Sequence, residues 1–265
     1  MLELYHNNIS VCSQKVRHAL AEKALEWVGH HVMLIDGEQT APDYLKLNSR
    51  ALVPTLVHDG VPIVESTVIN EYLDDVFAAP PLKPADAHDR ARMRLWTKVP
   101  DEGIHVACAS VSFSAAFARQ LQAKFTPDAL EERLAGMPDR ARAGRQRAIM
   151  EHGFNAPFVR DAILLFDETY QEMEEALGDG PWLAGQSFSL ADIALTPYLD
   201  RLNRLGLSPM WTRTRPRLTD WFARIRARPS YDRAYTSFGP VDYDDLLIER
   251  GESAWPDVEA ILEEA

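Results

Sequence analysis

The chain has 265 residues, of which 46% are hydrophobic, enough to bury a substantial core in two domains. Its net charge of −12 argues against a general affinity for nucleic acid or anionic membrane surfaces, because no overall positive field attracts them. Two cysteines, Cys12 and Cys108, are too few for a disulfide scaffold. Because no signal peptide and no run of about 18 apolar residues is found, we expect a cytoplasmic protein that acts on small molecules or proteins.

The first 78 residues predict strands and helices in the order βαβ, α, ββα. Leu2 and Leu4 alternate with polar neighbours as in a strand, and residues 11–24 show helical spacing. A second strand is predicted within the apolar segment 28–34. Two further strands flank Asp59-Gly60, a pair that tolerates the positive φ angles of a tight hairpin turn.

A serine indicates where the next helix begins, and a run of prolines indicates where the first domain ends. Ser66 is the predicted N-cap of a helix that runs to Val76. The proline-rich residues 79–88 predict a linker between a first domain, 1–78, and an all-helical second domain, 89–265.

Within the second domain, the helix that begins near Asp89 should kink near Pro100, because proline lacks the N–H that a helix needs. The charged residues 126–156 predict an insertion or lid between helices. Ser189 and Asp192 have the spacing of a capping box at a helix start. Two apolar stripes predict buried helix faces: Phe166, Tyr170, Met173 and Leu177, and Leu218, Trp221, Phe222 and Ile225.

Three motifs, in this order and spacing, carry a resemblance to a known family. They are "SVCSQKVR", "NSRALVPTL" followed by "ES", and "LAGQSFSLADI". Together they resemble the glutathione transferases across the full length of the chain. The resemblance implies an α+β, thioredoxin-like N-terminal domain followed by an all-α C-terminal domain. It also implies glutathione as co-substrate, a small hydrophobic or aromatic electrophile, and a homodimer.

The resemblance assigns glutathione-binding roles to residues of the first domain. Val53-Pro54 would be a cis peptide, with the main chain of Val53 paired to the cysteinyl part of glutathione. Glu65 would accept from the ligand ammonium, and the helix start at Ser66 would hold the γ-glutamyl carboxylate. Gln39 resembles a residue used toward the glycyl carboxylate, whereas Leu52 stands where Gln or Lys is common in the family. The alternatives are an ordinary proline at a strand start and a plain helix cap.

Three side chains at the start of the first helix are candidates for stabilising the glutathione thiolate: Ser10, Cys12 and Ser13, in that order. The stretch Ser10-Val11-Cys12 resembles the zeta class, in which the first serine activates glutathione and the cysteine assists. It also resembles the Ser-x-Cys of reductive dehalogenases, in which the cysteine forms a mixed disulfide. An inert Cys12 and a helix-capping Ser13 remain open.

The segment "VHDGVPIVESTVINEYLDDVF" and the later insertion resemble bacterial β-aryl etherases, whose glutathione-facing serine aligns nearer Ser13. This likeness implies thiolate attack on an electrophilic carbon and cleavage of lignin-derived β-aryl ethers. The alternatives are Cys12-dependent thiol transfer, isomerase or reductive dehalogenase activity, and a non-catalytic binding module. Trp96, His105 and Phe113 are the candidates for lining the electrophile pocket, and the alternative for them is ordinary core packing. No metal is assigned to His30-His31, because adjacent strand residues point to opposite faces.

Overall fold

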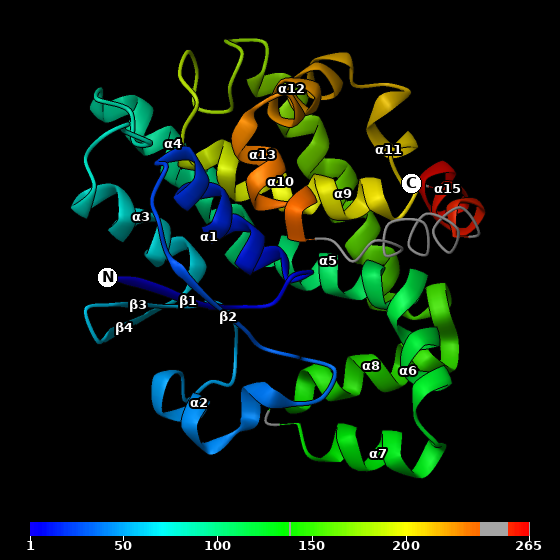
Figure 1. Ribbon diagram of the computed structural model, residues 1–265. Coiled ribbons are helices and arrows are strands. Elements are labelled where there is room, and N and C mark those ends of the chain that lie inside the picture. The colour runs from blue at the N-terminus through cyan, green and yellow to red at the C-terminus, as the bar shows by residue number, and fades with distance from the viewer. Residues whose placement is uncertain (138, 239–253, 265) are drawn as a thin grey trace. The chain divides into compact units, whose positions relative to one another are not determined.

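A computed structural model describes residues 1–137, 139–238 and 254–264, which form two compact units (Figure 1). Unit 1 comprises Met1–Lys98, Ala176–Pro197 and the segment that begins at Asp220. Unit 2 comprises Val99–Glu175, Tyr198–Thr219 and the C-terminal residues. The chain thus enters each unit more than once, and the predicted division into 1–78, 79–88 and 89–265 remains a prediction. None of the described helices is long and apolar enough to cross a membrane.

Unit 1 is built on a four-stranded mixed sheet with the order β2-β1-β3-β4. The strands are β1 (Leu2–His6), β2 (Val28–His31), β3 (Thr55–His58) and β4 (Val61–Val64). β1 pairs parallel to β2 and antiparallel to β3, which forms the predicted hairpin with β4. The hairpin turn places Asp59 and Gly60 at φ angles of 50° and 84°, as the Asp-Gly pair predicts. β2 is shorter than the apolar segment suggested, ending at His31.

Helices cover both sides of this sheet. α1 (Val11–Glu22) and α3 (Ser66–Val76) pack against each other on one side, and α2 (Pro42–Leu47) lies on the other (Figure 1). α13 (Pro229–Ala234) also packs on α1. The core consists of fully buried apolar side chains: Leu4, Val16, Leu20, Leu56, Ile69 and Leu73. β1 is a central strand of the sheet, and its Leu2 and Leu4 alternate with more hydrophilic residues and are buried.

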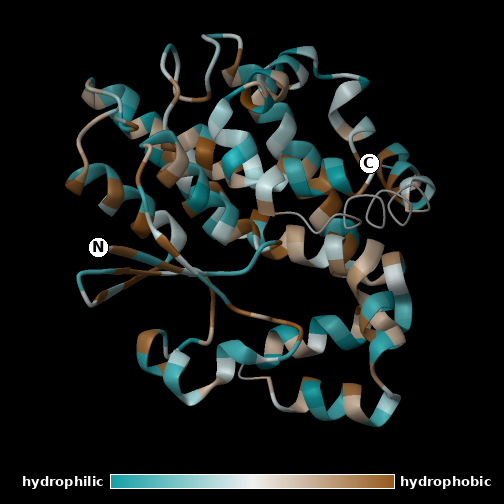
Figure 2. Ribbon diagram, in the orientation of Figure 1, coloured by the Kyte–Doolittle hydropathy of each residue, from teal (hydrophilic) through white to brown (hydrophobic). Residues whose placement is uncertain are grey.

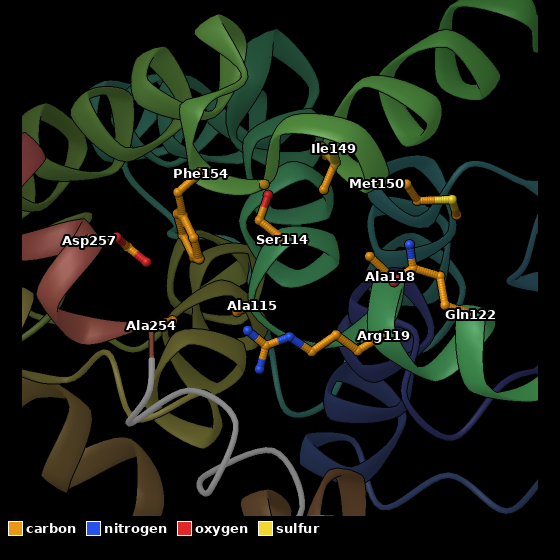
Figure 3. Close-up of a pocket in the computed structure, with 11 residues that line it drawn as sticks. Ser114, Ala115, Ala118, Arg119, Gln122, Ile149, Met150, Phe154, Ala254 and Asp257 are labelled. Carbon is orange, nitrogen blue, oxygen red and sulfur yellow. The ribbon is translucent and has the colours of Figure 1, made fainter.

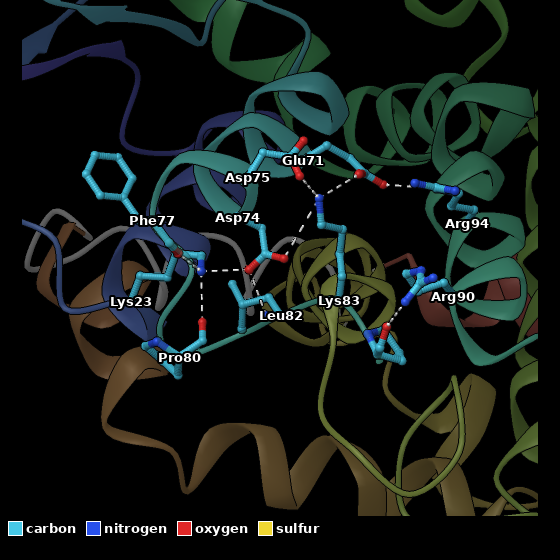
Figure 4. A network of polar contacts seen from close by, with 11 residues as sticks. Lys23, Glu71, Asp74, Asp75, Phe77, Pro80, Leu82, Lys83, Arg90 and Arg94 are labelled. Carbon is cyan, nitrogen blue, oxygen red and sulfur yellow. Dashed lines mark hydrogen bonds and ion pairs between the residues drawn. The ribbon is translucent and has the colours of Figure 1, made fainter. Parts of the chain in front are cut away.

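A polar network holds the linker after α3 against unit 1 (Figure 4). The buried Lys23 ammonium lies 2.6 Å from Asp74 and donates to the carbonyls of Phe77 and Pro80 at 2.6 and 2.8 Å. Asp74 also accepts from the Leu82 amide at 2.8 Å. Because each buried charge has partners, this network fixes the chain direction between α3 and α4 without an unpaired ion.

α4 (Ala87–Val99) ends at a π-helical turn, Pro100–Ile104, in which Gly103 leaves the helical conformation with φ 164° and ψ −38°. A kink near Pro100 was predicted and is confirmed. A side chain at Gly103 would meet Leu165 at 3.0 Å, so the glycine permits the close approach of α9 (Pro157–Ala176).

Unit 2 is helical throughout its described residues. Its helices are α5 (His105–Ser112), α6 (Ala118–Lys124), α7 (Pro127–Ala135), α8 (Arg140–His152), α9 (Pro157–Ala176), α11 (Pro209–Thr212) and α15 (Trp255–Glu263). α10 (Leu190–Arg204) and α12 (Pro216–Arg226) contribute residues to both units. The charged insertion 126–156 contains α7 and α8, and α8 is largely hydrophilic in Figure 2. All eight residues of the two predicted apolar stripes are buried.

Two predicted helix caps have different outcomes. At α10, Ser189 accepts from the Ala191 amide, and Asp192 accepts from the Ser189 amide at 2.9 Å, which confirms the capping box. At α3, the prediction that Ser66 is the N-cap is wrong. Ser66 is the first helical residue and Glu65 occupies the cap position with φ 70°, without a capping bond from its side chain.

Candidate functional site

The loop between β1 and α1 is held by its own polar groups. The Asn7 side chain accepts from the Ile9 amide at 3.2 Å and donates to the Val32 carbonyl at 2.9 Å. The Asn7 carbonyl accepts from the Ser10 amide at 3.3 Å. These bonds hold the loop together and connect it to the segment beyond β2, so Ser10 has a defined position.

The three predicted catalytic residues occupy successive positions at the amino end of α1. Ser10 is the N-cap, and its hydroxyl oxygen accepts from the Ser13 amide at 3.3 Å. Because that bond uses only an acceptor lone pair, the Ser10 hydroxyl keeps its proton to donate. Ser10 and Cys12 are half-buried, and Cys12 belongs to no disulfide. Ser13 is fully buried and accepts from the Asn7 amide at 3.3 Å.

The start of α1 therefore offers donors to an anion. The amide of Val11 donates no hydrogen bond within the described residues, as expected for a first-turn N–H. Together with the helix dipole, this amide and the Ser10 hydroxyl favour a negative charge at the helix start. The arrangement is able to stabilise a thiolate, the nucleophilic form of a thiol.

The Val53-Pro54 peptide is cis. The Leu52 carbonyl before it accepts from the Tyr44 hydroxyl at 2.5 Å and from the Asn48 side chain at 2.9 Å. By contrast, the amide and carbonyl of Val53 make no hydrogen bond within the described ranges. A main-chain donor and acceptor are thus held in place without a protein partner, as an extended peptide ligand requires.

Charged side chains gather at the amino end of α3. Arg50 forms an ion pair with Glu65, and both side chains are about half exposed. Lys15 is buried and donates to the Thr67 hydroxyl at 2.9 Å. Together with the helix dipole, the two cations make this end of α3 attractive to a carboxylate. Glu65 already has a cationic partner here, so a ligand ammonium would have to share Glu65 with Arg50 or displace Arg50.

The remaining predicted site residues lie in different parts of the chain. Gln39 belongs to a short 3₁₀ turn, Glu38–Thr40, and its side-chain oxygen is buried without a donor among the described residues. Trp96 lies on α4 in unit 1 and is half-buried. His105 and Phe113 belong to unit 2, where His105 is exposed and Phe113 is buried. The structure thus assigns Trp96 and the other two to separate units.

Unit 2 contains a cavity of about 250 Å³ that none of these three residues lines (Figure 3). Its walls come from residues 114–122, the end of α8 with the following turn, and the start of α15. Ile149, Met150 and Phe154 provide apolar surface, and Arg119 supplies a cationic group. Ser114, Ala115, Ala118, Gln122, Gly153, Ala254 and Asp257 complete the lining. Such a mixture of apolar walls and a few polar groups suits a small aromatic molecule.

Sequence reasoning missed the residues that support the site rather than contact a ligand. Asn7 donates to the Val32 carbonyl, which is distant in sequence, and Tyr44 and Asn48 donate to the Leu52 carbonyl beyond the end of their helix. No local sequence pattern marks these bonds. Arg17 had a signal: it lies within "SVCSQKVR" on a helix in which every residue from Ser13 to Ala21 is buried. A buried arginine needs partners.

Comparisons with known proteins identify the family. The sequence model for the glutathione S-transferase N-terminal domain matches residues 9–76, and the C-terminal domain model matches residues 139–229. Protein LigF of Sphingobium sp. (strain NBRC 103272 / SYK-6) is 32% identical over 95% of this chain and 98% of its own length. The tetrachloro-p-hydroquinone reductive dehalogenase of Sphingobium chlorophenolicum is 28% identical over 88% of this chain and 95% of its own.

A solved structure agrees with this result. The crystal structure of the β-etherase LigF superposes with a TM-score of 0.79 at 31% identity, covering 89% of this chain and 99% of the LigF chain. The predicted fold class is thereby confirmed: a small mixed sheet with helices, followed by a helical region. The chain belongs to the glutathione S-transferase family, whose enzymes use glutathione as co-substrate.

Proposed function

We propose that this enzyme catalyses attack of the glutathione thiolate on an electrophilic carbon, with β-aryl ethers as the substrate class. The observation that carries this proposal is the amino end of α1, where the Ser10 hydroxyl retains a proton and the Val11 amide is unbonded within the described residues. Both groups can donate to a sulfur anion, which lowers the pKa of the bound thiol. The likeness to a β-etherase over nearly the whole chain supports this choice of substrate.

The proposed reaction is a displacement. The thiol proton passes to solvent, the thiolate sulfur bonds to the carbon that carries the ether oxygen, and the carbon–oxygen bond breaks. The electron pair leaves with the phenolate, which takes a proton from water. The protein contributes by positioning the sulfur and by favouring its ionised form.

In this proposal glutathione binds along unit 1. Its cysteinyl part pairs with the unbonded main chain of Val53, and its γ-glutamyl carboxylate occupies the amino end of α3 at Ser66. Glu65 accepts from the ligand ammonium, which takes over part of the ion pair that Glu65 otherwise forms with Arg50. The buried oxygen of Gln39 offers an acceptor for a ligand N–H.

We also propose that the cavity of unit 2 binds a small aromatic molecule. Phe154, Ile149 and Met150 offer apolar contacts, and about 250 Å³ accommodates one aromatic ring with a short substituent. The sequence-derived candidates Trp96, His105 and Phe113 remain proposals for other contacts with the substrate.

A second candidate function rests on Cys12. Its thiol, which belongs to no disulfide, is half-buried at the second position of α1, beside the proposed thiolate site. The similarity to a reductive dehalogenase supports thiol exchange through this residue. In that case Cys12, rather than Ser10, determines the chemistry.

Three single variants separate these functions: Ser10→Ala, Cys12→Ser and Ser13→Ala. We expect Ser10→Ala to raise the pKa of bound glutathione by about one unit and to lower kcat/KM for a β-aryl ether about tenfold near neutral pH. Binding of S-methylglutathione, which has no ionisable thiol, should change little. Cys12→Ser should leave ether cleavage intact, and Ser13→Ala should mainly lower thermal stability.

Other outcomes would redirect the assignment. Loss of ether cleavage in Cys12→Ser would establish the cysteine mechanism instead. If calorimetry on the unaltered protein detected no glutathione binding at millimolar concentration, a non-catalytic binding module would be the better description. Phe154→Leu tests the cavity, because it should raise KM for the ether and leave KM for glutathione unchanged.

We also propose a cytoplasmic homodimer. Exposed apolar side chains on β4, α3 and α4 support an interface, since Val61, Val68 and Leu95 are 62%, 54% and 65% exposed. Sedimentation analysis should give twice the chain mass, and a monomer at micromolar concentration would contradict the proposal.

A further inference from the structure

Arg17 lies two turns into α1, one turn beyond Ser13, and is only 1% exposed. A helical side chain leans toward the amino end of its helix, which brings this guanidinium back to the loop before α1. It donates to the Asn7 carbonyl at 3.1 Å and to the Asn8 carbonyl at 2.9 Å. Both carbonyls belong to the loop that carries Ser10.

The other contacts of Arg17 come from β1 and from the far end of unit 1. Its Nη1 lies 3.2 Å from His6 Nδ1, and its Nε donates to the Ala234 carbonyl at 2.9 Å. The Phe238 ring lies under the guanidinium, with its centroid at 4.2 Å. An arginine supplies a planar guanidinium with several donors in fixed directions, which a lysine does not. The guanidinium therefore ties the loop to residues more than 200 positions later.

The charges around Arg17 are consistent with this arrangement. The imidazole of His6 on β1 contacts Arg17, and the ring of His31 on β2 lies against His6 in turn. Burial, followed by the Arg17 charge, lowers the pKa of His6 to about 3, so this imidazole is neutral and its Nδ1 can accept. The positive charge of Arg17 therefore lies beside a neutral imidazole.

We propose that Arg17 is the positioning residue of the Asn7–Ser10 loop, holding Ser10 in the orientation in which its hydroxyl donates to the glutathione thiolate. Arg17 acts through the loop and does not touch the ligand. The proposal rests on the proposed function. It adds that the segment Pro229–Phe238, through Ala234 and Phe238, helps to shape the thiolate site.

The test uses two variants of the full-length protein. Arg17→Met removes both the positive charge and the guanidinium donors, and Arg17→Lys keeps the charge but not the planar guanidinium. The control is Arg233→Gln, because Arg233 on α13 also donates to a main-chain carbonyl of α1, that of Ala21 at 3.1 Å, at the opposite end of the helix. Thermal unfolding is recorded for each variant. The pKa of bound glutathione is measured from thiolate absorbance, and Kd is measured for S-methylglutathione.

We expect Arg17→Met to raise the thiol pKa by about one unit and to lower kcat/KM about tenfold near neutral pH, with Kd for S-methylglutathione changed less than about threefold. Arg17→Lys should fall between this variant and the unaltered enzyme. Arg233→Gln should lose stability without a shift in thiol pKa. An unchanged thiol pKa in a folded Arg17→Met protein would overturn the proposal.

If Arg17→Met does not fold, Phe238→Leu provides the same test, since it keeps Arg17 and removes the ring beneath it. A smaller rise of the thiol pKa supports the positioning role, and no rise contradicts it. Failure of the unaltered enzyme to bind S-methylglutathione or glutathione would instead refute the proposed function.

Discussion

Ser10 and Ser13 carry the same hydroxyl group but have different tasks in the structure. Ser10 caps α1 and remains half-buried, whereas Ser13 is fully buried and binds the Asn7 amide. The sequence predicted that a hydroxyl at this helix start matters. It ranked Ser10 before Cys12 and Ser13 as the group that faces the glutathione sulfur, and that ranking remains a prediction.

At the scale of single residues, Asp192 should be among the most sensitive positions. Its fully buried carboxylate accepts from the amides of Leu183 and Ser189 and from the Trp221 indole at 2.8 Å. Asparagine has one acceptor oxygen and would turn an NH₂ group toward these donors. We expect Asp192→Asn to lower the free energy of unfolding by about 2 kcal/mol.

The measurement is urea unfolding at about pH 7.5, where the carboxylate is ionised, because burial raises the pKa of Asp192 only to about 6. The exposed Asp220 on α12 provides the control, and Asp220→Asn should change stability by less than about 0.5 kcal/mol. Equal effects of the two variants would show that the capping network is not a specific contributor.

At the scale of elements, Glu22 at the end of α1 binds the N-cap residue and the first turn of α13. Arg228 donates to both carboxylate oxygens at 2.6 and 2.7 Å, and Ser230 donates as well. Burial by itself raises the pKa of Glu22, but hydrogen bonds from Arg228 and Ser230, with His18 nearby at 3.7 Å, bring it well below its ordinary value of 4.5. The contribution of this pair is therefore present above pH 4.5 and is lost as the pH falls below it.

We expect Glu22→Gln to be less stable than the unaltered protein at neutral pH, and its stability to fall less steeply below pH 4.5. Denaturant unfolding across a pH series checks both expectations. Glu26→Gln, at an exposed position just after α1, should follow the unaltered protein. Parallel pH curves for the unaltered protein and Glu22→Gln would mean that the α1–α13 contact does not titrate in this way.

At the scale of the whole molecule, unit 1 is assembled from three stretches of chain. Buried polar groups of α1 have their partners in the last stretch: Arg17 at Ala234 and Glu22 at Arg228. A fragment of residues 1–88 would leave these groups without partners and would expose the side of α1 that α13 covers. We expect this fragment to lack a cooperative unfolding transition.

Circular dichroism during thermal unfolding tests the fragment against the full-length chain. A sharp transition for residues 1–88 would show that the N-terminal segment is stable without its C-terminal partners. Binding of S-methylglutathione to that fragment would further show that Phe238 and Ala234 are dispensable for the ligand site.

Local sequence was sufficient for the order of elements in residues 1–78, the hairpin turn at Asp59-Gly60, the capping box at Asp192 and the family, because spacing, turn chemistry and motifs act over a few residues. The tertiary structure alone decided that Glu65, not Ser66, stands at the cap of α3, and that Arg50 reaches Glu65. It also decided that Arg17 joins the Ser10 loop to residues 234 and 238. The partners of a buried charge are the groups that lie next to it in space, and these groups come together only when distant segments of the chain pack.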